Sequence, residues 1–198
     1  MRKVSLFSLA LLAVVFISCG AQKQVAQQQT SGSPFGDVYE APCTVYDTPE
    51  EFAATGIYRG SMNQKGEVHA YALANAQDIV RMKIKHAYKG MVSNYSSSVG
   101  NNAGNDIETK MSKAGDQIID AVVNNTAECC VKYGSVAADG HIECYVAIRI
   151  PKVDLSQKIA DEVANKLTDE EKMKIGFHES QYREQMTERF KQYQENNK

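Results

Sequence analysis

The sequence predicts an α+β fold in which helices cover one face of a small antiparallel sheet. Two runs rich in β-branched and aromatic residues flank a glycine-bearing turn, which is typical of a β-hairpin. Elsewhere apolar residues recur every three or four positions over long stretches, which is the period of an amphipathic helix. Strands and helices do not alternate as repeated β-α-β units, so we expect an antiparallel sheet rather than a parallel one.

The first predicted strand covers residues 52–62, where β-branched and aromatic residues are spaced by small ones. A long helix is predicted over residues 66–95, because its apolar positions step by three or four and basic residues lie on the opposite face. Those apolar positions are Leu73, Ala76, Val80, Ile84, Ala87, Met91 and Tyr95. Residues 96–106 are polar and glycine-bearing and predict a loop. A second, shorter helix is expected from Ile107 to about Ala121.

The hairpin strands are predicted over residues 122–133 and 141–150, joined by a turn that ends in Asp-Gly. A third helix is expected to follow, with Asp154 as its cap and an apolar residue at every fourth position up to Leu167. The long helix predicted over residues 66–95 is the natural cover for the sheet.

Residues 168–198 are predicted to form a charged helical tail. The spacing of Thr168 and Glu171 predicts a capping box, and Gly176 predicts a break in the helix. The tail carries a narrow apolar stripe made of Tyr182, Met186, Phe190 and Tyr193. This stripe either packs on the domain or forms a helix that binds a partner.

The N-terminus carries the pattern of an export signal. Arg2 and Lys3 precede an uncharged apolar run, residues 4–17, which is shorter than the roughly 20 residues that a membrane-spanning helix needs. The run ends in F-I-S-C, with Cys19 as its last residue, and this resembles the lipobox of bacterial lipoproteins. The resemblance implies cleavage before Cys19, attachment of diacylglycerol to its thiol and acylation of the new N-terminus. The alternatives are an ordinary signal peptide with a chance cysteine and an uncleaved anchor.

Two or three long acyl chains make an effectively permanent anchor, so we expect a protein tethered to a membrane rather than embedded in it. Gly20 is not an acid of the kind that retains enterobacterial lipoproteins at the inner membrane, so the resemblance favours the outer membrane. The glutamine-rich residues 20–36 lack the acidic cluster of surface-exported lipoproteins, which favours the periplasmic face over the cell surface. Their few apolar side chains predict a flexible tether. The four expected segments are a signal peptide (1–18), an acylated cysteine and tether (19–37), an α+β domain (38–167) and the tail (168–198).

Further motifs resemble one family of lipoproteins. The strand T-G-I-Y-R-G, the helix A-Y-A-L-A-N-A-Q-D and the hairpin end Y-V-A-I-R-I-P resemble the family typified by the twenty-kilodalton outer-membrane lipoprotein of Helicobacter, over roughly residues 43–166. The architecture is also similar to the N-terminal domain of a flagellar accessory protein and to lipoprotein activators of penicillin-binding proteins. Those relatives bind other envelope proteins, and none of the motifs is catalytic. The resemblance therefore implies a docking protein.

Five cysteines are present, and assigning Cys19 to lipid leaves an even set in an oxidising compartment, so disulfides are expected. Cys129 and Cys130 are adjacent in a strand, so they should point to opposite faces and take different partners. Cys144 can meet one of them if the hairpin register places it opposite, and Cys43 can clamp the N-terminal segment to the other. We favour the pair Cys43 and Cys130.

The sequence does not indicate a reaction. The side chains that would have to form a metal cluster are Cys129, Cys130, Cys144 and His141. This set lacks C-x-x-C spacing and needs two oppositely directed thiols to converge, so we expect no metal site. His69, His86 and His178 lie on polar or partly polar stretches and are interpreted as surface residues. Motifs such as G-x-S-x-G or H-E-x-x-H do not occur, and we expect neither an enzyme nor a cofactor.

Charge and composition limit the kinds of partner that we expect. Lys plus Arg number 22 and Asp plus Glu number 24, and the formal net charge of -2 gives no field strong enough to recruit nucleic acid. The expected partners are the outer membrane, through the lipid on Cys19, and another envelope protein. The leading hypothesis is that the chain is a non-enzymatic, lipid-anchored envelope lipoprotein whose folded domain docks another envelope protein. The alternative is an anchored binder or hydrolase of a small ligand or glycan, which an enclosed polar pocket with convergent ionisable groups would favour.

Overall fold

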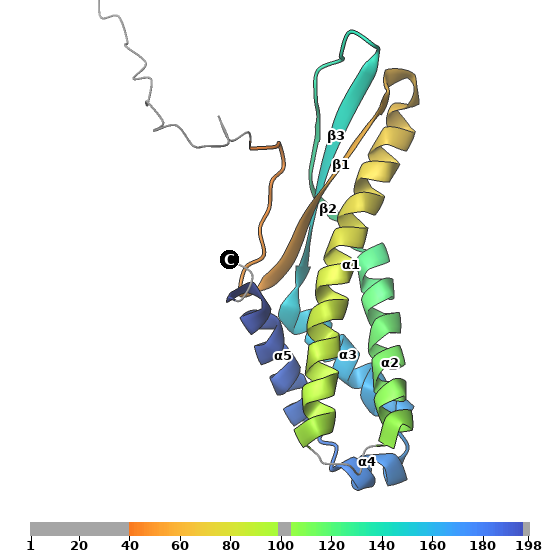
Figure 1. The fold of residues 1–198 in the computed structure, drawn as a ribbon, viewed down its shortest axis with the longest axis vertical. Helices are drawn as coiled ribbons and strands as arrows, with labels where there is room; N and C mark the ends of the chain where they lie inside the picture. Colours follow the sequence, from red (N-terminus) through yellow and green to blue (C-terminus); the bar gives the residue numbers. More distant parts are fainter. Residues whose placement is uncertain (1–39, 99–103, 196–198) are drawn as a thin grey trace, which may run out of the picture. The chain divides into compact units, whose positions relative to one another are not determined.

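The computed structural model describes residues 40–98 and 104–195, and within them a three-stranded antiparallel sheet is combined with five α-helices (Figure 1). The strands are β1 (Glu51–Ser61), β2 (Glu128–Tyr133) and β3 (His141–Pro151). The helices are α1 (Lys65–Ser98), α2 (Gly104–Asn124), α3 (Lys152–Lys166), α4 (Asp169–Ile175) and α5 (Glu179–Glu195), and a 3-10 turn (Met62–Gln64) joins β1 to α1. The α+β fold class predicted from the sequence is confirmed. The signal, the lipobox with Cys19 and the tether lie outside the described residues.

The strand order is β1-β3-β2, so β3 lies in the centre of the sheet and β1 and β2 are its two edges. β1 pairs with β3 along its whole length, from Glu51 opposite Pro151 to Ser61 opposite His141. β2 pairs with the other side of β3, and a β-bulge interrupts the pairing near its first residues. The hairpin predicted from the runs of β-branched and aromatic residues is confirmed as an antiparallel pair of β2 and β3, and only the start of its first strand differs.

α1 lies on one face of the sheet, and small residues allow it to approach closely. Gly56 of β1 faces α1, and a Cβ added there would lie 2.1 Å from the carbonyl oxygen of Ala72 and 2.3 Å from the backbone nitrogen of Ala76. Both alanines are fully buried. The backbones of α1 and β1 can therefore lie in close contact, because the helix is rich in alanine and the strand has a glycine at this point.

α2 and α5 pack against the second half of α1, beyond the part that covers the sheet, and α3 packs on α2 and α5 (Figure 1). The Tyr88 hydroxyl of α1 donates to the Met111 carbonyl oxygen of α2 at 2.7 Å and lies 3.1 Å from the Tyr182 hydroxyl of α5. Burial raises the pKa of Tyr182 well above its usual value of 10.0. One hydrogen-bonded pair of phenols thus links three helices inside an apolar core.

The apolar stripe of the C-terminal tail is part of this core. Tyr182, Met186 and Phe190 have no exposed surface, and the ring of Phe190 meets the ring of Phe52 edge-on, with centroids 5.1 Å apart. Of the two interpretations of the stripe, packing on the domain is the one that the structure shows. α4 and α5 belong to the same unit as the preceding elements, which begins at Glu40.

The ends of α3 and α4 follow local sequence signals with one exception. Thr168 and Glu171 form the predicted capping box at the start of α4, and Gly176 ends that helix with a φ of 58°. The exception is Asp154, which does not cap α3. The helix starts directly after Pro151, and Asp154 lies in its first turn, where a carboxylate also interacts favourably with the helix dipole.

Two boundaries differ from the sequence prediction. The loop expected over 96–106 is shorter, because α1 continues to Ser98 and α2 begins at Gly104. The strand expected from residue 122 begins only at Glu128, and residues 122–124 form the last turn of α2. Val123 is fully buried in the helical core, so tertiary packing outweighs the β-propensity of this valine pair.

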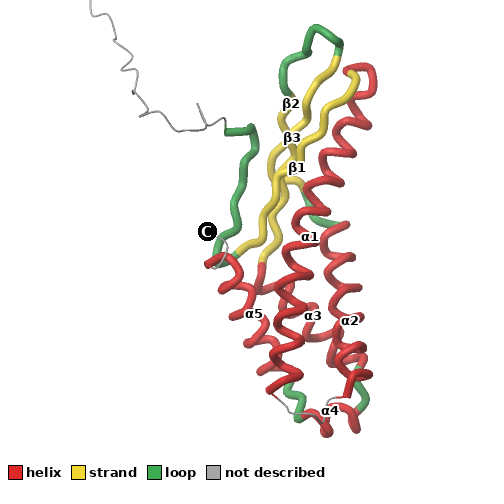
Figure 2. Tube along the Cα trace, viewed as in Figure 1, coloured by secondary structure: helices red, strands yellow, loops and turns green. Residues whose placement is uncertain are grey.

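Residues 41–50 form an extended strap on the face of the sheet opposite α1 (Figure 2). The Thr55 hydroxyl donates to the Cys43 carbonyl oxygen at 2.7 Å, and the Val45 amide donates to the Thr55 hydroxyl at 3.1 Å. The buried Lys152 ammonium donates to the Thr48 carbonyl oxygen at 2.7 Å, and desolvation lowers the pKa of this lysine. The strap is therefore fixed to both the sheet and α3.

Candidate docking surfaces

The cysteines form one disulfide, between Cys43 of the strap and Cys130 of β2, whose Cα atoms are 5.7 Å apart. This is the pair favoured from the sequence. Cys144 is buried and Cys129 is exposed, and both are free thiols. The expectation that Cys129 and Cys130 face opposite sides is wrong, because the β-bulge interrupts the alternation there and Cys129 lies beside Arg149, on the Cys130 face.

Within residues 40–98 and 104–195, no three His, Cys, Asp or Glu side chains are grouped so that they could hold a metal ion. Two histidines pair instead with single carboxylates. His69 Nε2 lies 2.9 Å from Glu128, and His141 Nδ1 lies 3.2 Å from Asp139. The first pair joins α1 to β2, and the second lies within the turn that leads into β3.

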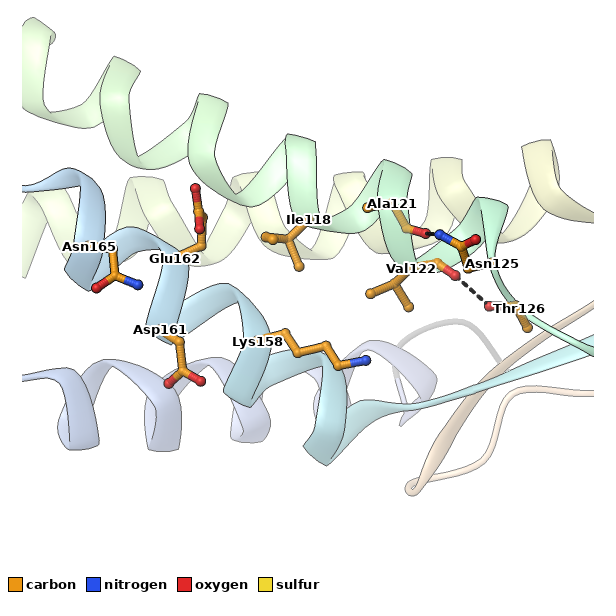
Figure 3. A pocket seen from close by; sticks show the side chains of 9 residues that line it. All are labelled: Ile118, Ala121, Val122, Asn125, Thr126, Lys158, Asp161, Glu162 and Asn165. Atoms are coloured by element: carbon orange, nitrogen blue, oxygen red, sulfur yellow. Dashed lines mark hydrogen bonds between the residues drawn. The ribbon is translucent and has the colours of Figure 1, made fainter.

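A groove of about 550 Å³ lies between α2 and α3 (Figure 3). Its walls are formed by Ile118, Ala121, Val122, Asn125 and Thr126 on one side and by Lys158, Asp161, Glu162 and Asn165 on the other. The Asn125 and Thr126 side chains donate to the Ala121 and Val122 carbonyl oxygens and so complete the end of α2. Figure 3 shows the carboxylates of Asp161 and Glu162 pointing away from each other. Such an open groove differs from the enclosed pockets with convergent polar groups that typically bind small molecules.

Apolar side chains on both faces of the sheet are exposed around its end, where β1 turns into α1 and β2 turns into β3. We call this set the hairpin-end surface, and it consists of Ile57, Tyr58, Met62, Tyr71, Tyr133 and Val136, each between 39% and 56% exposed. The rings of Tyr58 and Tyr71 are 4.8 Å apart, and the Lys65 ammonium lies 4.2 Å from the centre of the Tyr133 ring. Tyrosine is a residue type enriched at protein interfaces, because it combines a large apolar ring with a hydroxyl.

Polar contacts hold the turns that carry this surface. The Arg59 guanidinium donates to the Asp139 carboxylate, and the Met62 amide donates to the Gly140 carbonyl oxygen at 3.0 Å. The hydrogen bond from Arg59, together with one from the His141 amide, lowers the pKa of Asp139 to about 2. The two turns at this end of the sheet are thereby joined to each other.

Sequence reasoning missed this surface because its exposure depends on where α1 begins over the sheet. One signal was present. Ile57 and Tyr58 are adjacent in a strand, so their side chains point to opposite faces and a single covering helix leaves one of them uncovered.

Comparison with known proteins gives no relatives: no family model, curated protein or solved structure matches the chain. None of the helices in the described ranges combines the length and the apolar character that a membrane crossing needs.

Proposed function

We propose that this protein is a non-enzymatic, lipid-anchored lipoprotein of the outer membrane whose folded domain docks another envelope protein. The basic residues and apolar run at the N-terminus, ending at Cys19, support the anchor. The resemblance of the strand, helix and hairpin motifs to the Helicobacter lipoprotein family supports the docking role. We place the domain on the periplasmic face, because residues 20–36 lack an acidic cluster.

The hairpin-end surface is the observation that carries the docking proposal. Six large apolar side chains are exposed around one end of the sheet, three of them tyrosines. Exposed apolar side chains that lie together mark interaction sites on folded proteins more often than isolated ones do, and Tyr58 and Tyr71 form such a pair. The aromatic pair of Tyr58 and Tyr71 and the Lys65–Tyr133 contact hold their rings in place, which lowers the entropy cost of binding.

The anchor is tested by comparing the wild type with Cys19→Ala in detergent phase partition and intact mass spectrometry. We expect the wild type to enter the detergent phase and to carry the added mass of diacylglycerol and a further acyl chain, and the variant to lose both. Cys129→Ala, which removes an exposed free thiol, is the matched control and should behave as wild type. A Cys19→Ala protein that is processed and retained normally would overturn the anchor.

Docking is tested by photocrosslinking in cells, with a benzophenone amino acid at Tyr71 of the hairpin-end surface. Two exposed control positions lie elsewhere, at Lys158 in the α2–α3 groove and at Met173 on α4. We expect Tyr71 to give one discrete crosslinked protein and the controls to give none. Crosslinks from Lys158 alone would move the docking site to the groove. Saturable binding of a small ligand or glycan at the groove, with no protein crosslink from any position, would favour the alternative function.

A further inference from the structure

We propose that the outer edge of β2 binds an extended, acidic segment of the docked protein as a fourth strand of the sheet. The inference rests on the proposed docking function and specifies the chemistry of the partner. It is argued from the difference between the two edges of the sheet and from the charges beside β2.

The outer edge of β1 is closed by side chains. The Ala53 amide donates to Asp47 Oδ1 at 2.8 Å, and its carbonyl oxygen accepts from the Lys83 ammonium at 2.7 Å. The Ile57 amide donates to Asn75 Oδ1 at 3.1 Å. Three backbone groups that would pair with another strand are therefore already used, and this blocks the edge at Ala53 and Ile57, as is common at protected edges.

The outer edge of β2 is open. The Gly134 amide donates to the Glu143 carbonyl oxygen of β3 at 2.9 Å. Bonded residues alternate in an antiparallel pair, so Lys132 also bonds with β3, whereas Val131 and Tyr133 turn their N–H and C=O groups outward. In the described part of the chain, no side chain or backbone group bonds to these outward groups. An extended polypeptide is the ligand that matches such a row of donors and acceptors.

The positive charges beside β2 favour an added strand that carries acidic side chains. The Lys65 ammonium lies over Tyr133 on the α1 side of the edge, and exposed Lys132 lies on the opposite face. Neither lysine forms an ion pair with a carboxylate of the described residues. Of the two nearby carboxylates, Glu128 is paired with His69, and Glu143 accepts a hydrogen bond from the Tyr145 hydroxyl. Cross-strand neighbours lie roughly 4.5–5.5 Å apart between Cβ atoms, so carboxylates on an added strand would lie within reach of both lysines.

A second copy of this chain fits the edge poorly. Two antiparallel β2 strands that use Val131 and Tyr133 would bring their Lys132 side chains directly opposite or diagonal to each other on one face. Like charges in these positions destabilise a strand pair. Lys132 and the β-bulge are also devices by which edge strands avoid self-association. The same lysine that disfavours a second copy favours an acidic partner.

The test uses the full chain in detergent and a fluorescent, capped eight-residue peptide of four Thr and four Glu, with Glu on both faces. One control peptide has Lys in place of Glu, and a second is N-methylated at alternate amides. We expect the acidic peptide to bind in anisotropy titrations and to slow hydrogen exchange at the Val131 and Tyr133 amides. Both control peptides should bind at least about tenfold more weakly, because charge and backbone pairing are each lost.

Three variants of the protein complete the design. Val131→Pro removes an outward N–H that β3 does not use, and we expect it to retain the circular dichroism spectrum and lose peptide binding. Lys132→Glu should reverse the preference toward the Lys peptide, and it keeps the test valid if the proline variant does not fold. Lys174→Glu, at an exposed position on α4, is the charge-matched control and should bind as wild type.

The proposal is overturned if the acidic peptide leaves the exchange of Val131 and Tyr133 unchanged, or if protection falls on the α2–α3 groove. It is also overturned if these amides become protected with rising protein concentration alone, since that would show pairing of two copies. None of these outcomes affects phase partition of the anchor or crosslinking from Tyr71. A failure of the strand proposal is thus distinguishable from a failure of the proposed function.

Discussion

Replacing Gly56 with Ala tests the closest approach between α1 and the sheet. The new Cβ would lie 2.1 Å from the Ala72 carbonyl oxygen and 2.3 Å from the Ala76 nitrogen, whereas ordinary contacts begin at 3.4 Å. Both obstacles are backbone atoms of α1, so the helix must move away from β1. Overpacking costs about 1–3 kcal/mol, and we place this site at the upper end because no side chain can rotate to relieve it. The better strand propensity of Ala returns about 0.5–1 kcal/mol.

The net expectation for Gly56→Ala is a loss of about 2 kcal/mol or more in the free energy of unfolding, measured by urea denaturation. In a chain of this size, that loss lowers the midpoint of thermal unfolding by about 4–8 °C. Gly66→Ala is the matched control, because an added Cβ at Gly66 meets nothing within 4 Å and a helix favours Ala over Gly. The reasoning is refuted if Gly56→Ala unfolds at the wild-type midpoint or above it.

Three further expectations concern the core, the disulfide and the hairpin end. Gly115→Ala would place a Cβ 2.2 Å from a ring carbon of buried Tyr88, so we expect urea unfolding to show a loss of about 2 kcal/mol, and an unchanged midpoint would contradict this packing. Cys130→Ser opens a bridge with a sequence separation of 87, so we expect a loss of about 2–5 kcal/mol that dithiothreitol reproduces in the wild type; equal stability with and without reductant would argue against the bridge. Arg59→Gln removes the main cause of the low pKa of Asp139, so carbon NMR should show that pKa rising from about 2 toward 3.8, and a value that stays in place would exclude Arg59 as the cause. Because the pKa of Asp139 is lower in the folded state, the stability that this carboxylate contributes is present above pH 3.8 and is lost as the pH falls through about 2.

Much of the fold could be predicted because it depends on local periodicity. The apolar steps from Leu73 to Tyr95 predicted α1, and six of the seven positions named there are buried in the structure. The capping box at Thr168 and the break at Gly176 were also predicted, because each is decided within a few residues. Val123 was assigned to a strand, since its own propensity favours a strand and only its packing partners favour a helix.

The candidate site was less accessible to prediction, since it is formed by residues from separate elements. Ring pairs such as Tyr58 with Tyr71 depend on the distance at which α1 crosses β1. The closed edge of β1 depends on Asn75 and Lys83 of α1 reaching the strand backbone, and the open edge of β2 depends on the absence of such a helix face beside it among the described residues. No periodicity in one segment carries this information.

The sequence by itself determined the fold class, the order of the elements and the apolar faces of the helices, because these follow from backbone propensity and from which side chains avoid water. It also carries the whole of the argument for a lipid anchor at Cys19. Only the tertiary structure decided that Cys43 bonds Cys130 while Cys129 stays exposed, that the C-terminal stripe joins the core, and that one edge of the sheet is closed and the other open. These outcomes depend on distances between segments far apart in the chain, and such distances are set when all the elements pack at once.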